Sequence, residues 1–221
     1  MSTIYLSDNT NKILQNYLER LGHNLVLIKD TGLVYPEVAT HADIYMCKLG
    51  VEPESPIFQG GTDDILCLGY KYPENVKYNA ACVGDFFIHN LHYTSPALLE
   101  KIKQLGFTTI HVKQGYTKCN LVVINKHAAI TSDEGIYKHM KNHIEVLLIE
   151  PGHVKLGEFP YGFLGGASGR VGNEVIFNGN LKSHPDYKKI SGFITAQNLR
   201  IKYFEEYPLE DIGSIIEWRN K

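Results

Sequence analysis

The sequence predicts an α/β fold of the propeller type, in which a strand–strand–helix–strand unit recurs five times within a single domain spanning residues 1–221. Three observations predict it. The same order of apolar strand, turn, capped helix and strand recurs along the chain, and the capping residues Ser95 and Ser132 lie 37 positions apart. Repeats of roughly 20–50 residues are typical of arrays and propellers, because one such unit cannot bury its own faces. The two chain ends each supply part of one unit, so that their pairing would close a ring.

The amino-terminal segment supplies most of this split unit. Residues 3–6 are predicted as a strand, residues 13–21 carry apolar side chains at helical spacing, and residues 24–28 are predicted as the next strand. Residues 212–218 supply the remaining strand. We expect that strand to pair beside an amino-terminal one, because both would otherwise leave an open sheet edge.

The next unit begins at His41 and is predicted to lack its helix. It has a strand at residues 44–47, a loop rich in proline and glycine at residues 50–63, and a strand at residues 64–68. Three complete units follow, at residues 81–112, 118–149 and 173–204. The extra length before the last of them falls in a glycine-rich stretch, residues 151–172, which we expect to form a flexible lid or a close backbone approach to the centre.

Composition excludes several classes of partner. The 221 residues are 43% hydrophobic, which is enough for a substantial core. The formal net charge of -2 gives no basic excess for phosphate contacts, so nucleic acid is not an expected partner. The apolar runs have strand length and are too short for a membrane helix, so no membrane partner is expected. The chain opens without a basic and apolar leader, which predicts a cytoplasmic location.

The cysteines and histidines do not predict a metal site or a cofactor. Cys47, Cys67 and Cys82 lie in or beside apolar runs, where cysteine usually acts as a small hydrophobe, and neither they nor Cys119 form a CxxC pair. His89 and His92 are three positions apart, and His139 and His143 are four apart. The second pair lies near a helix end without an accompanying carboxylate motif, so its histidines are expected to be solvated.

The repeats and the amino-acid sequences of three segments resemble those of a known family. The segments are Lys-Gln-Gly-Tyr-Thr-Lys-Cys-Asn at 113–120, Gly-Phe-Leu-Gly-Gly-Ala-Ser-Gly at 162–169 and Asn-Glu-Val-Ile-Phe-Asn-Gly at 173–179. The chain resembles the pentein superfamily, and most of all a bacterial branch of it without an assigned activity. That superfamily contains guanidine-modifying enzymes and a non-enzymatic ribosome anti-association factor. The resemblance implies five units around a pseudo-fivefold axis.

In such a ring, the first strand of each unit lines a central channel, so the polar residues that enter those strands are expected to converge. These residues are His41 and Asp43, Asn79, the segment 113–119, the segment 168–173 and the segment 211–214. One interpretation is a polar plug, in which the side chains satisfy one another. The other is a ligand pocket. The sequence leaves both open.

The resemblance also implies a catalytic chemistry, but this sequence departs from the family pattern at one position. The guanidine-modifying enzymes use a late cysteine nucleophile, a histidine base and carboxylates that hold the guanidinium, but residues 162–173 contain no cysteine. The remaining thiol candidate is Cys119, with His41 as base and Asp43 as clamp; the neighbouring cation of Lys118 would lower the thiol pKa. The alternative is that Cys119 only begins a buried strand. Further candidate ligand-binding residues are Asn79, Lys113, Gln114, Tyr116, Lys118, Ser168, Arg170 and Asn173.

The sequence therefore leaves two functions from different classes. The first is binding or chemical modification of a small polar ligand, guanidino or amino-acid-like, in the central channel. If it is enzymatic, a thiol-dependent hydrolase or transferase is expected. The second is a non-catalytic interaction module, as the ribosome factor shows to be possible on this fold. The glycine-rich stretch does not predict a nucleotide site, because it leads into a strand at residues 174–177 instead of a helix.

Overall fold

A computed structural model describes residues 1–66 and 68–220, and within them the chain is mixed α/β with five small sheets, four of three strands and one of two. The split unit forms as expected. β1 (Thr3–Ser7), α1 (Lys12–Arg20) and β2 (Asn24–Ile28) come from the amino terminus, and β14 (Ile216–Trp218) comes from the carboxyl terminus. β14 pairs antiparallel with β1, which pairs parallel with β2, so the predicted pairing of the two chain ends is confirmed.

Three further sheets share this order, with a first strand antiparallel to the second and the second parallel to the third across a helix. Their elements are β5 (Ala81–Val83), β6 (Phe86–His89), α4 (Pro96–Gln104) and β7 (Thr108–His111); β8 (Leu121–Asn125), β9 (Ala128–Thr131), α6 (Glu134–Met140) and β10 (Glu145–Leu148); and β11 (Ser168–Val171), β12 (Glu174–Phe177), the 3-10 turn η1 (Leu181–Ser183), α7 (Tyr187–Ala196) and β13 (Arg200–Lys202). Four of the five sheets therefore share one strand order.

The crossover helices form for local reasons that the sequence contains. Ser95 caps α4, because its Oγ accepts a hydrogen bond from the backbone N–H of Leu98 at 3.4 Å, and proline follows at the first helical position. Asp133 caps α6 in the same way, through the N–H of Ile136 at 2.8 Å. Leu98 and Ile136 are also fully buried. Each helix is thus fixed at its start and held against its sheet by one apolar face.

The two-stranded unit differs from the prediction. It contains the single-turn helix α2 (Ala42–Tyr45), β3 (Met46–Lys48), β4 (Ile57–Gln59) and α3 (Thr62–Leu66). The strand predicted at residues 64–68 is wrong over its described part, since a short apolar run does not distinguish a strand from a buried helix. The loop predicted at residues 50–63 contains β4, which pairs with β3. Cys67 lies outside the described residues.

The glycine-rich stretch is more ordered than expected. Its last residues form β11, so the final repeat begins at Ser168 and not at residue 173, and the lid interpretation is wrong for this part. Glycine is required here because a Cβ on Gly169 would collide with the backbone carbonyl of Ile215, just before β14. The absence of a side chain therefore lets β11 lie directly against its neighbour.

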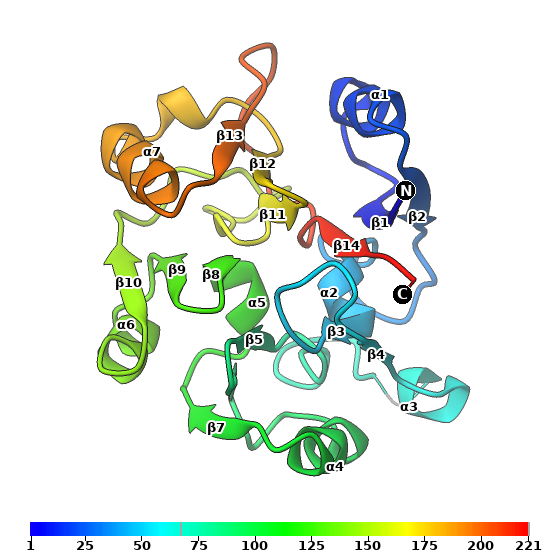
Figure 1. Cartoon of the computed structure of the whole chain (residues 1–221). Coiled ribbons are helices and arrows are strands. Elements are labelled where there is room, and N and C mark those ends of the chain that lie inside the picture. Colours follow the sequence, from blue (N-terminus) through cyan, green and yellow to red (C-terminus); the bar gives the residue numbers. More distant parts are fainter. Residues whose placement is uncertain (67, 221) are drawn as a thin grey trace.

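The five sheets are arranged around a common centre, with α1, α3, α4, α6 and α7 at the periphery and the single-turn helices nearer the middle (Figure 1). The first strands are largely buried, whereas the third strands are mostly half-buried or exposed. β11 lies against β14 and β8, and β5 lies against β8 and β3. Met46 of β3 packs with Ile216 of β14, which brings the two ends of this series together. The first strands therefore line the middle of the molecule.

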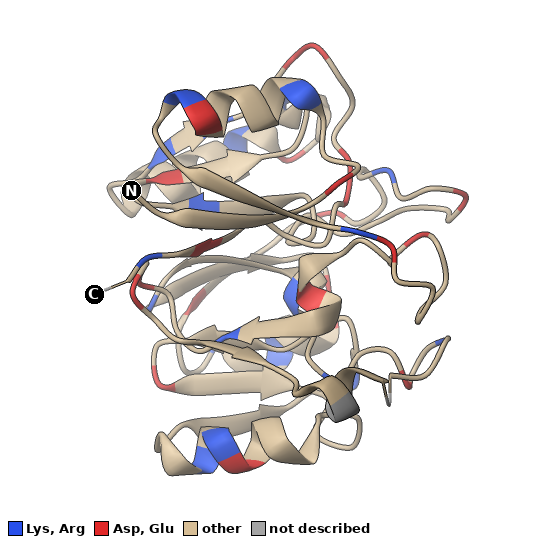
Figure 2. Cartoon of the chain, turned by 90° about the vertical axis from the view of Figure 1, so that its right-hand side faces the viewer, with Lys and Arg blue, Asp and Glu red and all other residues tan. Residues whose placement is uncertain are grey.

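Lys and Arg alternate with Asp and Glu over the elements seen from the side, without a block of one sign (Figure 2). This distribution agrees with the small net charge of -2. In the part of the chain that the structure describes, no helix combines the length and the apolar character needed to cross a membrane.

Candidate functional site

The polar residues that precede the first strands meet in the middle of the molecule. Cys119 and Asn79 precede β8 and β5, and Asp43 lies in α2, before β3. The Cys119 thiol donates to Asp43 Oδ2 at 3.1 Å, and Asn79 Nδ2 donates to Cys119 Sγ at 3.3 Å. All three residues are buried. The structure thus brings together three side chains from three units, as the sequence predicted.

A fourth and a fifth residue extend this cluster. Lys118 Nζ donates to Ser214 Oγ at 2.9 Å, and Ser214 Oγ donates to Asp43 Oδ2 at 2.7 Å. Ser214 has a φ of 74°, a left-handed conformation that is costly for a residue other than glycine. Its N–H donates to the carbonyl of Gly166 at 2.8 Å, which holds this conformation. The hydrogen-bonded network across the centre matches the polar plug that the sequence left open.

Asn79 fixes the position of the thiol. Its Oδ1 accepts hydrogen bonds from the backbone N–H groups of Lys118 at 2.8 Å and of Cys119 at 3.2 Å. These two residues belong to the single-turn helix α5 (Thr117–Asn120), whose first N–H groups have no partner within the helix. Asn79 therefore satisfies that helix start and contacts the thiol with its other side-chain atom.

His41 and Asp211 lie on another side of the thiol. His41 Nδ1 is 3.9 Å from Asp211 Oδ1, which is too long for a hydrogen bond. Asp211 Oδ1 accepts from the N–H of Gly213 at 3.0 Å, and its Oδ2 accepts from the N–H of Phe163 at 2.9 Å. One ligating atom from each of His41, Cys119 and Asp211 lies within 4.8 Å of the others. The thiol, the imidazole and the carboxylate can therefore act on one small molecule.

Glycines allow the backbone to close around these groups. A Cβ on Gly166 would overlap the Asp211 carboxylate, and one on Gly213, whose φ is 69°, would overlap the His41 side chain. A Cβ on Gly165 would lie 2.5 Å from the carbonyl oxygen of Cys119. The glycine-rich stretch therefore makes the close backbone approach that was one of the two expectations for it.

A cavity of about 150 Å³ opens beside the thiol. Cys119, His41 and Asp211 line it, and its walls are otherwise almost entirely apolar or aromatic: Tyr35, Val38, Tyr116, Leu156, Phe159, Tyr161 and Phe163. The hydroxyls of Tyr35 and Tyr116 are 2.7 Å apart and hydrogen-bonded, which fixes the two rings. An adjoining pocket of about 290 Å³ shares His41 and Asp211 and is lined by Glu37, Glu158 and Glu210 as well. The approach to the thiol is thus acidic on one side and aromatic on the other.

Burial determines the protonation of the cluster. It lowers the pKa of His41 to about 4 and raises the pKa of Asp211 to about 6. It also raises the pKa of Cys119 well above its usual range, and the Asp43 and Asp211 carboxylates add to this effect. At neutral pH the imidazole is uncharged, the thiol is protonated and Asp211 is a carboxylate.

The expectation that Lys118 activates the thiol is therefore wrong. Burial and the two carboxylates outweigh the lysine cation, whose hydrogen bond goes to Ser214 and not to the sulfur. Burial lowers the pKa of Lys118 itself, against the opposing effect of Asp43. A thiol in this setting needs a further positive charge nearby before it becomes a nucleophile.

The other predicted ligand-binding residues divide into three groups. Tyr116 lines the thiol cavity, and Gln114 Oε1 accepts from its N–H at 3.0 Å and so positions it. Lys113 is exposed and contributes a backbone carbonyl to Asn90 Nδ2 at 2.9 Å. Asn173 is exposed in the turn between β11 and β12. Neither Lys113 nor Asn173 is among the residues that line the thiol cavity.

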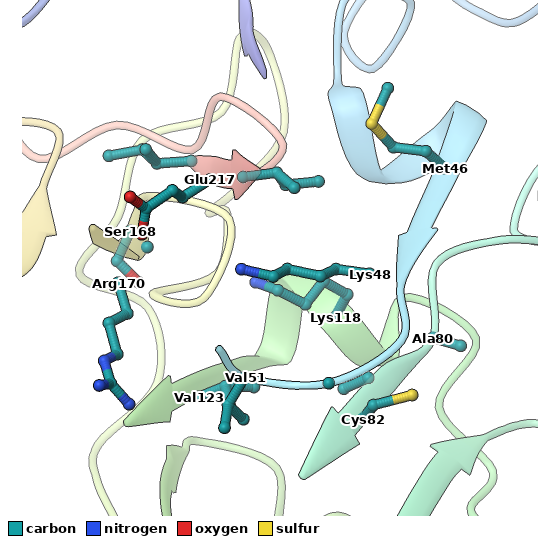
Figure 3. Close-up of a pocket in the computed structure, with 15 residues that line it drawn as sticks. Met46, Lys48, Val51, Ala80, Cys82, Lys118, Val123, Ser168, Arg170 and Glu217 are labelled. Atoms are coloured by element: carbon teal, nitrogen blue, oxygen red, sulfur yellow. The ribbon is translucent and has the colours of Figure 1, made fainter. Parts of the chain in front are cut away.

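Ser168 and Arg170 line a different cavity, of about 60 Å³ (Figure 3). Lys48, Lys118 and Glu217 also line it. Arg170 is engaged with the backbone, since its Nε donates to the carbonyl of Gly172 at 3.0 Å. These two predicted residues are thus separated from the thiol cavity, although Lys118 connects the two places through its hydrogen bond to Ser214.

Sequence reasoning missed several residues of the site. Segment 211–214 was expected to converge on the centre, but Asp211 and Ser214 were not singled out. The aromatic walls were also missed, although Phe159, Tyr161 and Phe163 alternate within the glycine-rich stretch. Such alternation in a loop is a signal, because aromatic side chains there need a surface to cover.

Comparison with known proteins gives one match. No curated protein and no solved structure matches the chain. A family model described as a family of unknown function, DUF6873, matches residues 61–216, which include Asn79, Cys119 and Asp211 but not His41 or Asp43. Since the match covers more than half of the 221 residues, the chain belongs to this family of unknown function, DUF6873.

Proposed function

We propose that the protein is a pentein-like propeller that binds a small cationic ligand, of the guanidino or amidino class, in the aromatic-walled cavity beside Cys119. The fold assignment is supported by four three-stranded sheets that share one strand order, and by the first strands of all five sheets, which lie at the centre. The observation that carries the functional proposal is the cavity itself, where Cys119, His41 and Asp211 from three different units face one apolar space.

The charge balance of the cluster favours a cation. Counted by formal charge, the cluster holds two carboxylates, Asp43 and Asp211, against one ammonium, Lys118, while burial favours uncharged His41 and Cys119. The sum is about -1, which is costly in a buried site. A guanidinium beside Asp211 would balance it and would pair with the carboxylate through two hydrogen bonds. The faces of the surrounding aromatic rings also attract a cation.

Such a ligand would activate the thiol that it meets. A positive charge in the cavity offsets the two carboxylates and so lowers the Cys119 pKa, and the neutral His41 imidazole can accept the thiol proton. The thiolate then forms a bond to the central guanidinium carbon. One nitrogen leaves with the proton from His41, and water cleaves the carbon–sulfur bond to give a ureido product and the free thiol. The reaction is a thiol-dependent hydrolysis.

A binding experiment with paired ligands tests the proposal. Agmatine and arginine should raise the melting temperature and bind in isothermal titration, whereas the uncharged ureido analogue citrulline should not. Asp211→Asn should weaken this binding at least tenfold, while the exposed control Glu206→Gln should leave it unchanged. Equal binding of arginine and citrulline, or wild-type affinity in Asp211→Asn, would contradict the cationic site.

Turnover separates binding from catalysis. Wild-type protein incubated with agmatine should release ammonia and form a ureido product, and Cys119→Ser should bind the ligand without forming it. Binding of agmatine with no product in the wild type would leave a binding protein. That result would contradict the proposed hydrolysis but not the proposed ligand site.

A second candidate function rests on the surface around the cavity. Tyr72 and Tyr93 are exposed and stack edge to face, and Tyr72 also contacts Tyr116 of the cavity wall. Phe159 and Tyr161 are exposed at the same cavity. These rings offer an aromatic rim for a non-catalytic interaction module, like the ribosome factor of the superfamily. Co-sedimentation with ribosomal subunits, lost in Tyr72→Ser and Phe159→Ser, would favour it over the ligand site.

A further inference from the structure

The His41–Cys119–Asp211 cluster has a composition that the proposed ligand site does not fully use. Imidazole, thiol and carboxylate are the three side-chain groups that bind Zn²⁺ most often. Here they come from three separate units of the chain, and each is almost completely buried, with exposed fractions of 3%, 2% and 4%. We propose that His41, Cys119 and Asp211 form a binding site for Zn²⁺, with the fourth coordination position facing the aromatic-walled cavity.

The distances suit a tetrahedral ion after a small contraction. The three ligating atoms lie within 4.8 Å of one another, and His41 Nδ1 is 3.9 Å from Asp211 Oδ1. Zinc bonds of about 2.0–2.3 Å place tetrahedral ligand atoms roughly 3.3–3.8 Å apart. A contraction of at most about 1.0–1.5 Å at the widest pair therefore completes the site, and the His41–Asp211 pair is already close to that spacing.

His41 supplies an independent observation. Its Nδ1 is buried and makes no hydrogen bond within the described residues. A buried ring nitrogen without a partner is costly, because it has lost its contact with water and gained nothing in return. This atom is directed at the Asp211 carboxylate from a distance too long for a hydrogen bond. An ion between the two would satisfy both groups.

The other two ligands are held in place for an ion. Each Asp211 oxygen accepts one backbone N–H, from Gly213 and from Phe163, which fixes the plane of the carboxylate and leaves further lone pairs free. Asn79 Nδ2 already donates to the Cys119 sulfur. A hydrogen-bond donor to a thiolate is a usual second-layer contact of a zinc site.

Binding is balanced in charge and in protons. The cluster of Asp43, Asp211, Lys118, neutral His41 and protonated Cys119 carries about -1. Zn²⁺ adds two positive charges, and the Cys119 thiol gives its proton to solvent and becomes a thiolate ligand, so that the sum becomes zero. The fourth position then holds water or a ligand from the cavity of about 150 Å³. Three protein ligands with one open position is the pattern of a reactive rather than a purely structural zinc site.

Titration of chelator-treated, full-length protein tests the site with Zn²⁺ and with Co²⁺ as a coloured substitute. We expect one equivalent of Co²⁺ to produce a thiolate-to-metal absorption band and tetrahedral visible bands, and Zn²⁺ to displace it. Cys119→Ser should abolish the thiolate band and weaken Zn²⁺ binding at least about 100-fold. His41→Asn should weaken binding while keeping the thiolate band. The matched control is Cys82→Ser, which removes a buried thiol outside the cluster and should change neither result.

X-ray absorption at the zinc edge of the wild-type protein gives a test that needs no variant. One sulfur and two or three nitrogen or oxygen neighbours are expected. A shell without sulfur, a thiolate band that survives Cys119→Ser, or no binding of one equivalent of Zn²⁺ would overturn the proposal. The inference does not depend on the guanidino ligand, since loss of agmatine binding and loss of zinc binding are measured separately. If both bind, they should compete, because they share Asp211 and Cys119.

Discussion

At the scale of single residues, the site depends on three groups whose protonation is governed by burial. Cys119 is held as a thiol by its low exposure and by two carboxylates, and His41 is held neutral although Asp43 lies nearby. The acid and base of the cluster are therefore in the states that proton transfer from sulfur to imidazole requires. What the cluster lacks is a further positive charge, beyond that of Lys118, to start that transfer.

The reactivity of Cys119 should reflect this balance. In the unliganded protein we expect slow alkylation by iodoacetamide at neutral pH and faster alkylation as the pH rises. Asp43→Asn removes a negative charge that hydrogen-bonds the thiol, so the Cys119 pKa should fall and the alkylation rate near pH 8 should rise by about tenfold. Mass spectrometry of peptides measures this rate, with Cys82 of the same sample as internal reference. A rate unchanged by Asp43→Asn would show that the carboxylate does not control the thiol.

The pKa of His41 predicts a pH dependence of stability. Its folded-state value of about 4 lies below the unfolded value near 6.5, so only the unfolded chain binds this proton between those values. The contribution of neutral His41 to the free energy of unfolding is therefore fully present above about pH 6.5, and it is lost as the pH falls towards about 4. When the pH falls from about 7.5 to 5, the wild type should lose about 2 kcal/mol more unfolding free energy than His41→Asn loses. Urea unfolding measures this change, and the control His127→Asn, on an exposed ring, should track the wild-type curve.

At the scale of elements, backbone contacts decide where the site residues lie. α5 is only one turn long, and Asn79 from another unit holds its first N–H groups. The segment from Gly162 to Gly166 packs its backbone against Asp211 and against the carbonyls around Cys119. The position of the thiol cavity therefore depends on glycines as much as on the reactive residues.

Two matched glycine substitutions test this role. Gly165→Ala places a Cβ 2.5 Å from the carbonyl oxygens of Cys119 and Leu121, which are backbone atoms and cannot turn away. We expect it to lower the free energy of unfolding by more than about 2 kcal/mol. Gly192→Ala lies on the exposed side of α7 with open space around it, and should raise stability by about 0.5–1 kcal/mol. Chemical denaturation of both variants measures the contrast, and equal effects would contradict the packing of this stretch.

The same elements show what the sequence can predict. The helices with serine or aspartate caps and regular apolar spacing were expected where they occur, because their signals are local. The strand β11 and the helix α3 were not expected, since one lies in a glycine-rich stretch and the other in a short apolar run. The convergence of Asp43, Asn79, Lys118 and Cys119 followed from the repeat. Asp211, the aromatic walls and the raised thiol pKa could not follow from it, because they depend on packing between units.

At the scale of the whole molecule, the two ends of the chain are joined in one sheet. β14 pairs with β1, and Glu217 in β14 makes two contacts beyond that pair. Its Oε1 accepts from Ser2 Oγ at 2.7 Å, and its Oε2 accepts from the N–H of Gly172 at 2.8 Å. The first contact ties β14 to the amino terminus, and the second ties it to the turn between β11 and β12. The sequence predicted the pairing but not this buried carboxylate.

Glu217→Ala should therefore weaken the attachment of β14 to the amino terminus. It leaves the buried Ser2 hydroxyl and the Gly172 N–H without their acceptor, which should cost about 1–2 kcal/mol of unfolding free energy. Glu206→Ala removes an exposed carboxylate of the same kind and should cost less than about 0.5 kcal/mol. Thermal unfolding of both variants compares the two effects. Similar melting temperatures would show that this attachment does not depend on Glu217.

The central claim is that the cavity beside Cys119 holds a small cation. A crystal structure of the protein grown with agmatine tests it most directly. The account predicts a guanidinium within hydrogen-bond distance of the Asp211 carboxylate, between the aromatic walls, with its central carbon facing Cys119 Sγ. A cavity without agmatine at a saturating concentration, or agmatine bound only elsewhere on the protein, would contradict it.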